Sequence, residues 1–244
     1  MTQFLTELDT ATTIFPPTEY ALSEPNGLLA IGGDLSADRL KRAYQSGIFP
    51  WFSEEDPLLW WSPDPRCVFD IASFRVSRSL KKSLRRCGYT ISVNRAFDEV
   101  VAGCAGPREQ ESGTWILPEM AHAYGELHRQ GAAHSIEVWA GETLVGGLYG
   151  VCSGRQFSGE SMFFRQTDAS KVALTGLVAL LHSTGARWID CQIANPHLIS
   201  LGAIEVPRKQ YIEQLNLEIC TVLPEEHWVA RDITGLVSDY AGIN

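Results

Sequence analysis

The sequence predicts an α+β fold, with a small irregular N-terminal domain ahead of a larger domain of alternating helices and strands. Seven of the 12 prolines and three of the seven tryptophans lie before residue 66. Proline removes a backbone donor and fixes φ, so this stretch cannot build long regular elements. After residue 66, segments of helical and of strand periodicity alternate, as in a sheet covered by helices. We therefore divide the chain into domains 1–66 and 67–244.

Helices are predicted where a capping residue precedes, or a glycine follows, an amphipathic stretch. Ser36 and Asn94 are such caps, and Gly47 and Gly88 are such endings. The predicted helices cover residues 36–45, 77–86, 95–104, 118–130, 169–183 and 208–219. Strands are predicted where β-branched and aromatic residues gather, at 89–93, 134–139, 143–151, 155–160 and 187–193. The turn at 140–142 predicts that the second and third of these strands form a hairpin.

Composition excludes several classes of protein. With 45% apolar and 20% charged residues, the chain is neither disordered, collagen-like nor a coiled coil. No stretch reaches the ~18–20 apolar residues of a membrane span, and the first ten residues carry acids where an export signal carries Lys or Arg. The six cysteines are far apart, without a CxxC pair, which is typical of reduced thiols rather than a metal site. We expect a cytoplasmic monomer with no membrane span, metal ion or cofactor.

The net charge of −9 argues at first against a nucleic-acid partner. The charge is unevenly distributed, however. Residues 66–86 hold seven basic residues and one acid, a local charge of +6, which leaves −15 on the remainder. On the predicted helix, the cations share a broad face while Leu80 and Leu84 share another. Such a face is often merely solvated, but it also suits a phosphate backbone, and we predict that it binds one.

The predicted strand 187–193 carries two polar residues amid apolar ones. Asp190 and Gln192 are two residues apart, so in a regular strand they point to the same face, with Cys191 on the other. Burying this pair without partners is costly, which indicates a reaction centre as readily as a solvated strand end. Cys191 then faces away from the pair and is predicted to be a buried structural thiol, because nothing places His197 beside it.

A second polar position is Glu160, at the end of another predicted strand among apolar neighbours. An unpaired carboxylate is expensive to bury there. Either Arg155 or Arg165 neutralises it, or it receives a cationic group of a substrate. Aromatic residues in the loop-like segments, such as Trp51, are either core or platforms for unpaired bases.

Together these segments resemble the bacterial leucyl/phenylalanyl-tRNA–protein transferase family. The matching blocks run in order through nearly the whole chain, and GIFPWF and WWSPDPR are especially specific. They cover residues 25–35, 47–52, 60–66, 113–116, 134–139, 144–150, 159–163 and 190–192.

The resemblance implies a GNAT-like acetyltransferase fold for the larger domain. It implies transfer of Leu or Phe, and weakly Met, from aminoacyl-tRNA to proteins that begin with Arg or Lys, which marks them for degradation by the N-degron pathway. By matching position, the residues for catalysis and acceptor binding are Glu160, Asp190 and Gln192. Those around the terminal adenosine are Trp51, Trp115, Tyr44 and Tyr124. Those of the amino-acid pocket are Leu148, Phe157, Met162, Leu177 and Ile189.

Three pocket positions depart from the family's usual residues. Leu148 and Leu177 stand where a well-known member has Met and Phe, and Phe164 replaces a smaller residue. The pocket stays apolar, but the preference between Leu and Phe remains open. The tRNA backbone is predicted to contact the basic helix, through Arg78, Lys81, Lys82, Arg85 and Arg86.

The expected chemistry is attack of an amine on an ester, which is downhill and needs no ATP or metal. The enzyme must position the two groups and stabilise the tetrahedral oxyanion. A glutamine amide is a weak base, so Gln192 is predicted to position the amine. Asp190 is predicted to orient the Gln192 amide, and Glu160 to anchor the cationic acceptor. The proton passes either through this pair or through the 2′-hydroxyl of the tRNA.

Two rival functions remain at this point. The first is an acyl-CoA-dependent N-acetyltransferase, but the segment 165–170 has no glycine to cradle a pyrophosphate and carries an acid. The second is a non-catalytic RNA-binding module, which leaves Glu160, Asp190 and Gln192 without a role.

Overall fold

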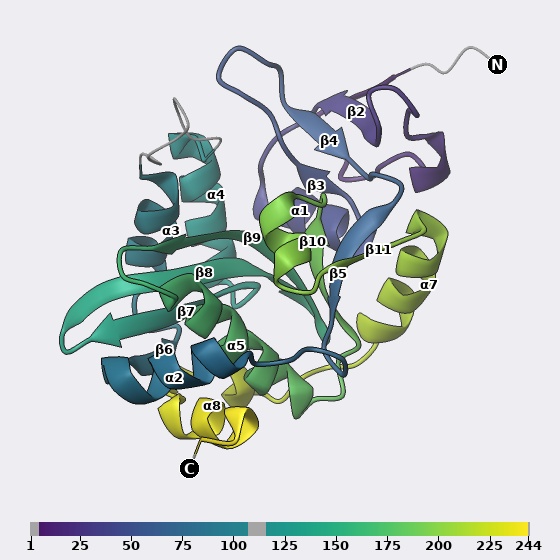
Figure 1. Ribbon diagram of the computed structural model, residues 1–244. Helices are drawn as coiled ribbons and strands as arrows, with labels where there is room; N and C mark the ends of the chain where they lie inside the picture. Colours follow the sequence, from purple (N-terminus) through teal and green to yellow (C-terminus); the bar gives the residue numbers. More distant parts are fainter. Residues whose placement is uncertain (1–4, 107–115, 244) are drawn as a thin grey trace.

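Two sheets organise the molecule, as the computed structural model shows for residues 5–106 and 116–243 (Figure 1). The first is small and has the strand order β1-β2-β4-β3. Its strands are β1 Thr6–Leu8, β2 Leu28–Gly32, β3 Phe49–Pro50 and β4 Leu59–Trp61, joined by η1 Thr18–Tyr20 and α1 Ala37–Gln45. Strands this short carry too little periodicity to be read from sequence, so the stretch predicted to be irregular contains a sheet that the sequence did not indicate.

The second sheet has eight strands in the order β11-β5-β10-β9-β8-β7-β6-β12. Every pairing is antiparallel except that of β9 with β10. Its strands are β5 Arg66–Asp70, β6 Thr90–Val93, β7 Ala133–Ala140, β8 Thr143–Ser153, β9 Gln156–Phe164, β10 Trp188–Gln192, β11 Ile204–Val206 and β12 Arg231–Asp232. The predicted α+β class is confirmed.

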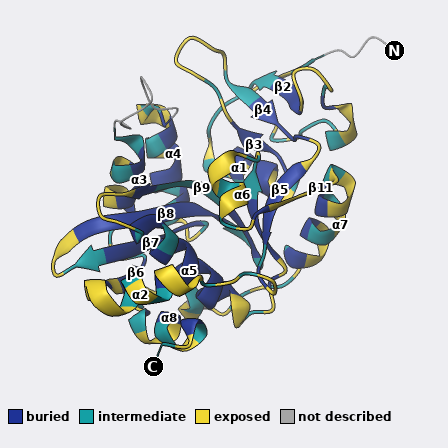
Figure 2. Cartoon of the chain, in the orientation of Figure 1, coloured by how far each residue is buried: buried dark blue, intermediate teal, exposed yellow. Residues whose placement is uncertain are grey.

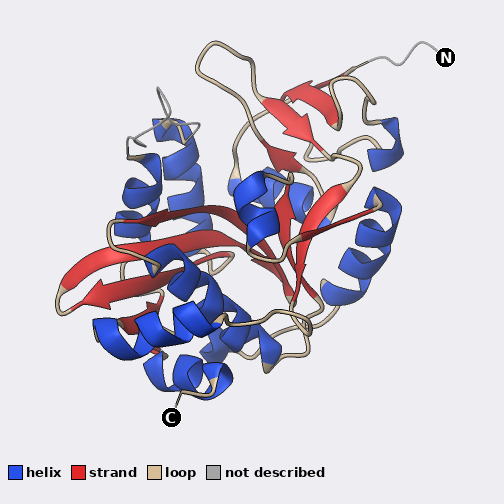
Figure 3. Cartoon of the chain, viewed as in Figure 1, coloured by secondary structure: helices blue, strands red, loops and turns tan. Residues whose placement is uncertain are grey.

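Helices cover both faces of the large sheet (Figures 1 and 3). One face packs on α3 Phe97–Ala105 and α4 Pro118–Arg129, and the other on α5 Ala169–His182, with α2 Arg78–Cys87 and α8 Thr234–Ala241 outside it. The chain also contains α6 Pro196–Ser200, α7 Arg208–Glu218 and η2 Glu225–Trp228. Along the described residues, no helix combines the length and the apolar character that a membrane crossing requires.

The apolar core joins the small sheet to the large one. A single buried cluster contains Leu29 and Trp60 of the small sheet together with Val100 of α3 and Leu127 of α4. The small sheet ends at Trp61 and β5 begins at Arg66, so the predicted division after residue 66 falls one residue inside the first strand of the large sheet. Because the core crosses that point, the division into two domains stays a prediction.

Most predicted elements occur within a few residues of their expected bounds. Ser77 caps α2 by accepting a hydrogen bond from the Leu80 N–H at 3.2 Å, and Gly88 ends the helix in the left-handed conformation with φ +62°. The predicted cap Asn94 is wrong. Helix α3 begins at Phe97, and the Asn94 side chain instead donates to the Trp228 carbonyl at 2.6 Å and accepts from the Ser135 N–H at 2.9 Å. Its amide therefore ties two strands to the C-terminal segment.

Candidate active site

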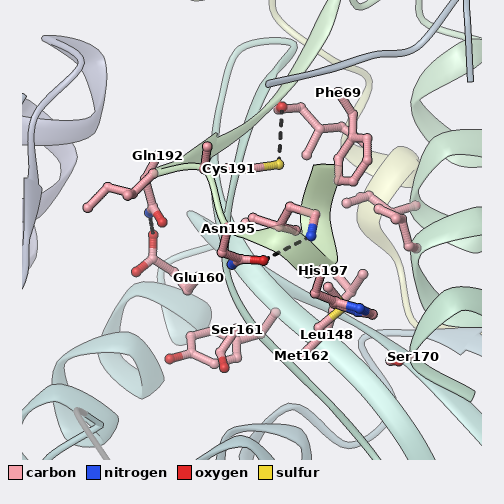
Figure 4. Close-up of a pocket in the computed structure, with 18 of the residues that line it drawn as sticks. Phe69, Leu148, Glu160, Ser161, Met162, Ser170, Cys191, Gln192, Asn195 and His197 are labelled. Atoms are coloured by element: carbon pink, nitrogen blue, oxygen red, sulfur yellow. Dashed lines mark hydrogen bonds between the residues drawn. The ribbon is translucent and has the colours of Figure 1, made fainter. Parts of the chain in front are cut away.

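A pocket of about 690 Å³ opens where β8, β9 and β10 meet α5 and α6 (Figure 4). Its floor is apolar and contains four of the five residues predicted for the amino-acid side chain, namely Leu148, Met162, Leu177 and Ile189. The fifth, Phe157, is fully buried and lies outside the lining, with its ring 5.7 Å from that of Trp228.

Glu160 lies in the wall of this pocket, on β9, and its two carboxylate oxygens have different partners. Gln192 Nε2 donates to Oε1 at 2.6 Å (Figure 4). The Tyr124 hydroxyl donates to Oε2 at 2.6 Å. The Tyr44 hydroxyl lies 2.7 Å from that of Tyr124 and donates to it in turn, since Tyr124 has used its own proton. The carboxylate therefore ends a chain of neutral donors.

Neither arginine that could have neutralised Glu160 does so. Arg155 pairs with Glu218 at 2.9 Å, and Arg165 donates to the Leu144 carbonyl at 3.3 Å. Among the described residues, no Lys, Arg or His side chain forms an ion pair with Glu160. Burial raises the pKa of Glu160 to about 7, and the negative charge of Asp190 adds to this, against hydrogen bonds from Tyr124, Tyr44 and Gln192 that lower it. The site is thus able to receive a proton or a cationic group near neutral pH.

Asp190 is fully buried and does not line the pocket. The Arg66 guanidinium donates to it twice, with both N–O distances 2.7 Å. Ser158 Oγ and the Tyr211 hydroxyl also donate to its Oδ2, each at 3.0 Å. An isolated buried carboxylate would be destabilising, and this set of donors compensates for the burial of Asp190.

The expectation that Asp190 orients the Gln192 amide is wrong. A bulge interrupts β10 between Asp190 and Gln192, and Gln192 has φ +62°. The alternation of a regular strand is lost there, and the Gln192 side chain turns to Glu160. Asp190 acts on Gln192 through the backbone instead, because its Oδ1 accepts the Gln192 N–H at 3.0 Å. It is a positioning residue that holds the bulge.

Arg66 is the partner that the sequence reasoning missed. It was counted among the cations of the basic window, yet it is buried and its Nη1 donates to the Gly47 carbonyl at 3.0 Å. In the sequence, Asp190 itself was the signal that such a partner exists, because a buried carboxylate requires a cation or several donors. The guanidinium also lies over the rings of Phe49 and Tyr211, at 4.8 and 4.7 Å.

Cys191 differs from its prediction as a buried thiol. It is half-buried and lines the pocket beside Ile189, while Cys67 of the neighbouring strand is buried. Two further pocket residues were missed, Asn195 and His197, which form a wall with α6. Asn195 caps this helix by accepting the Leu198 N–H at 2.9 Å. The Asn-Pro pair before the helix was a capping signal.

The four residues expected around the terminal adenosine lie in different environments. Trp51 is on the rim of the pocket with 44% of its surface exposed, and its carbonyl accepts from Trp61 Nε1 at 2.6 Å. Tyr44 and Tyr124 are buried and hold Glu160. They thus offer no open ring face to a base in this structure. Trp115 lies outside the described residues.

The basic helix α2 has the two faces that its sequence predicts. Leu80 is buried against the core, whereas Arg78, Lys82, Arg85 and Arg86 are exposed and Lys81 is half-buried (Figure 2). Within the described part of the chain, none of these five cations forms an ion pair. Ser83 Oγ donates to Asp168 Oδ2 at 2.7 Å, which fixes the helix to the start of α5.

Comparison with known proteins identifies the family. The family described as leucyl/phenylalanyl-tRNA protein transferase matches residues 68–216, and the N-terminal domain of that family matches residues 33–64. A leucyl/phenylalanyl-tRNA–protein transferase from Pseudoalteromonas atlantica is 53% identical, covering 90% of this chain and 94% of its own. One from Idiomarina loihiensis is 51% identical, covering 94% and 97%.

The solved structures that resemble this one are distant. L-PGS from Bacillus licheniformis has a TM-score of 0.39 and 14% identity, covering 61% of this chain and 48% of its own. This similarity is too low to bear on fold or function. The curated relatives, in contrast, match over almost their full length. The chain therefore belongs to the leucyl/phenylalanyl-tRNA protein transferase family and is an aminoacyltransferase that acts on aminoacyl-tRNA and protein.

Proposed function

We propose that this enzyme transfers leucine or phenylalanine, and weakly methionine, to the α-amino group of proteins that begin with Arg or Lys, and so marks them for degradation by the N-degron pathway. The observation that carries this proposal is the buried carboxylate of Glu160, which has no cationic partner among the described residues and meets Gln192 beside an apolar pocket.

The amino-acid side chain of the aminoacyl-tRNA enters the apolar floor formed by Leu148, Met162, Leu177 and Ile189. An apolar pocket rejects polar side chains but separates similar apolar ones poorly, because one methylene contributes only about 1–3 kcal/mol. Use of both Leu and Phe follows from this. The terminal adenosine lies toward Trp51 on the rim, whose indole gives an adenine base a stacking face.

The reaction joins the acceptor amine to the ester carbonyl. The nitrogen lone pair attacks the carbonyl carbon, the ester bond to the ribose breaks, and the freed ribose hydroxyl gains a proton. Gln192 donates its amide N–H to Glu160, which leaves its amide oxygen to accept a hydrogen bond from the attacking amine. Glu160, with a pKa of about 7, takes the proton that the amine loses.

The preference for Arg or Lys at the acceptor terminus rests on charge. Such a terminus carries two cations, the α-ammonium and the side chain. The net charge of −9 and the cation-free Glu160 favour their approach. The proposed enzyme is a monomer, and aminoacyl-tRNA as donor supports a cytoplasmic enzyme. Light scattering of the purified protein tests the first of these.

One assay tests the proposal against its rivals. Purified protein is mixed with leucyl-tRNA and peptides that differ only in a first residue of Arg, Lys or Ala, and each peptide is weighed by mass spectrometry. We expect leucine on the Arg and Lys peptides and little on the Ala peptide. Equal modification of all three would remove the acceptor preference. Acetylation in a parallel mixture with acetyl-CoA would instead support an N-acetyltransferase.

A further inference from the structure

Phe164 has no structural role that explains its position. It is the last residue of β9, it lines the pocket, and 65% of its surface is exposed. Strand alternation places it on the same face as Met162, about 7 Å away along the strand. Glu160 lies at an irregularity in the pairing of β9 with β8 and turns to Tyr124 of α4 instead. The residues of the pocket floor are buried or, in the case of Met162, half-buried. Phe164 therefore lies outside the amino-acid pocket and presents its ring to whatever occupies the rim.

The next residue supplies a cation. Arg165 is exposed, its guanidinium lies 5.3 Å from the centre of the Phe163 ring, and it donates to the Leu144 carbonyl at 3.3 Å. Within the described residues no carboxylate pairs with it. The acid nearest in sequence, Asp168, is occupied by Ser83 and by Lys171 at 2.8 Å. A guanidinium held over a ring and free of acids is suited to a phosphate.

The loop that follows leads directly to the basic helix. Tyr89, just beyond α2, donates from its hydroxyl to the Thr167 carbonyl at 3.1 Å, and Ser83 of α2 binds Asp168. The link between β9 and α5 therefore lies against α2, and α2 packs on α5 (Figure 1). The exposed cations of α2 thus lie on the α5 side of the sheet, which Met162 and Phe164 also face. Arg165, whose guanidinium lies over the Phe163 ring, follows directly at the end of β9.

The 3′ end of a tRNA is single-stranded cytidine-cytidine-adenosine, so the terminal adenosine in the pocket is joined to an unpaired cytidine outside it. We propose that Phe164 stacks on this penultimate base and that Arg165 contacts the adjoining phosphate. This inference rests on the proposed function and extends it to a second nucleotide. A benzene ring in solvent offers a π face and no hydrogen-bond group, which suits a base that is bound without being read.

The test uses donors that grow by one nucleotide: leucyl-adenosine, leucyl-cytidylyl-adenosine and leucyl-tRNA. With the native enzyme we expect the KM to fall about tenfold when the cytidine is added, within the range of one stacked base. Phe164→Ala should lose this gain, so that its KM for leucyl-cytidylyl-adenosine equals its KM for leucyl-adenosine. Phe164→Trp, which keeps a stacking face, should retain it. Ile204→Ala, which removes an exposed apolar side chain from β11, outside the pocket lining, is the control.

The possible negative results distinguish a failure of the stacking inference from a failure of the proposed function. If Phe164→Ala raises the KM for leucyl-adenosine as much as for the longer donors, the ring belongs to the amino-acid or adenosine subsite and the inference is overturned. It is overturned as well if the variant behaves like the native enzyme with every donor. If the native enzyme transfers leucine from none of the three, the proposed function itself fails. Arg165→Ala should flatten the salt dependence of leucyl-tRNA binding by about one phosphate contact, and an unchanged slope would remove Arg165 from the site.

Discussion

Arg66 and Asp190 form a doubly hydrogen-bonded ion pair that is closed to solvent, with both N–O distances 2.7 Å. The pair joins the start of β5 to the bulge of β10, and through the Gly47 carbonyl it reaches the N-terminal segment. The position of Gln192 in the pocket therefore depends on a contact on the far side of its own backbone.

Replacing Asp190 by Asn should destabilise the protein by about 3–5 kcal/mol, because Arg66 would remain buried without its counter-charge. It should also lower kcat more than it raises the KM for aminoacyl-tRNA, since Asp190 does not line the pocket. Thermal unfolding and steady-state kinetics measure the two effects.

The double variant Arg66→Met, Asp190→Leu separates folding from positioning. Removing both charges should recover much of the stability, while kcat stays low because the Gln192 N–H has lost its acceptor. Recovery of kcat together with stability would show that Asp190 serves only to fold the protein.

The pKa of about 7 for Glu160 predicts how the rate depends on pH. Because Glu160 must be ionised to take a proton, kcat at saturating substrates should rise as the pH passes through about 7 and level off above it. Glu160→Gln should lower kcat and abolish this inflection. The same inflection in the Gln variant would assign it to the acceptor amine, whose pKa is about 7.7–8.0 in free peptides.

The raised pKa of Glu160 also predicts that the folded protein loses stability as the pH rises. The unfolded chain ionises Glu160 above about pH 4.3, whereas the folded protein keeps the proton until about pH 7. Between these values the unfolded state binds fewer protons, so the native protein loses stability as the pH rises and stays lower above pH 7. Glu160→Gln should therefore raise the Tm above pH 7 and have little effect below pH 4. An equal change at both pH values would contradict the raised pKa.

Tyr124→Phe tests whether Tyr124 acts on Glu160 or on the adenosine. Its hydroxyl donates to Glu160 and lowers the pKa of that carboxyl, so the variant should shift the kcat inflection to higher pH and leave the KM for aminoacyl-tRNA nearly unchanged. Trp51→Ala should do the reverse, raising that KM about tenfold, as expected for one stacked base, without moving the inflection. An increased KM with Tyr124→Phe would restore the adenosine role.

Replacing Lys81, Lys82, Arg85 and Arg86 by Ala should weaken binding of aminoacyl-tRNA and flatten its dependence on salt, because fewer counterions are released. Ala favours the helix, so α2 should persist. The exposed pair Arg42 and Lys209, which lies outside α2, provides a control of similar chemistry. If binding is measured against salt concentration and the slope is unchanged, α2 does not contact the tRNA.

The sequence predicted the long elements well, because helices such as α5 and strands such as β8 have a clear period and clear ends. It did not predict β1, β3, β4, β11 or β12, which have two or three residues and hence no period. It also did not predict β2 and β5, which have five residues each and lie in or directly after the proline-rich stretch. In the site, residue types and order indicated Glu160 and Gln192. Their contact could not be predicted, since the bulge at Asp190 breaks the alternation on which the inference relied.

The ion pair between Arg66 and Asp190 could not be predicted from the sequence either, because the two residues are far apart along the chain. Arg66 and Asp190 are 124 positions apart, and nothing in a single sequence pairs one buried carboxylate with one of 20 basic residues. Arg66 stood within a basic cluster and was grouped with it, although its side chain points inward. Charge counted along the chain does not distinguish a solvated cation from a buried one.

The size of the pocket floor should decide the preference between Leu and Phe. Leu177 is only 1% exposed and forms part of the floor, on α5. A ring at this position fills space that the larger substrate needs, so Leu177→Phe should lower phenylalanine transfer relative to leucine transfer by roughly tenfold, the effect of a methylene or two. Both aminoacyl-tRNAs are offered in one reaction, because the product ratio then does not depend on how much of the variant is folded. Leu177→Met, which conserves volume, should leave the ratio within about twofold. A ratio that moves toward phenylalanine in the Phe variant would mean that the substrate side chain does not reach this part of the floor.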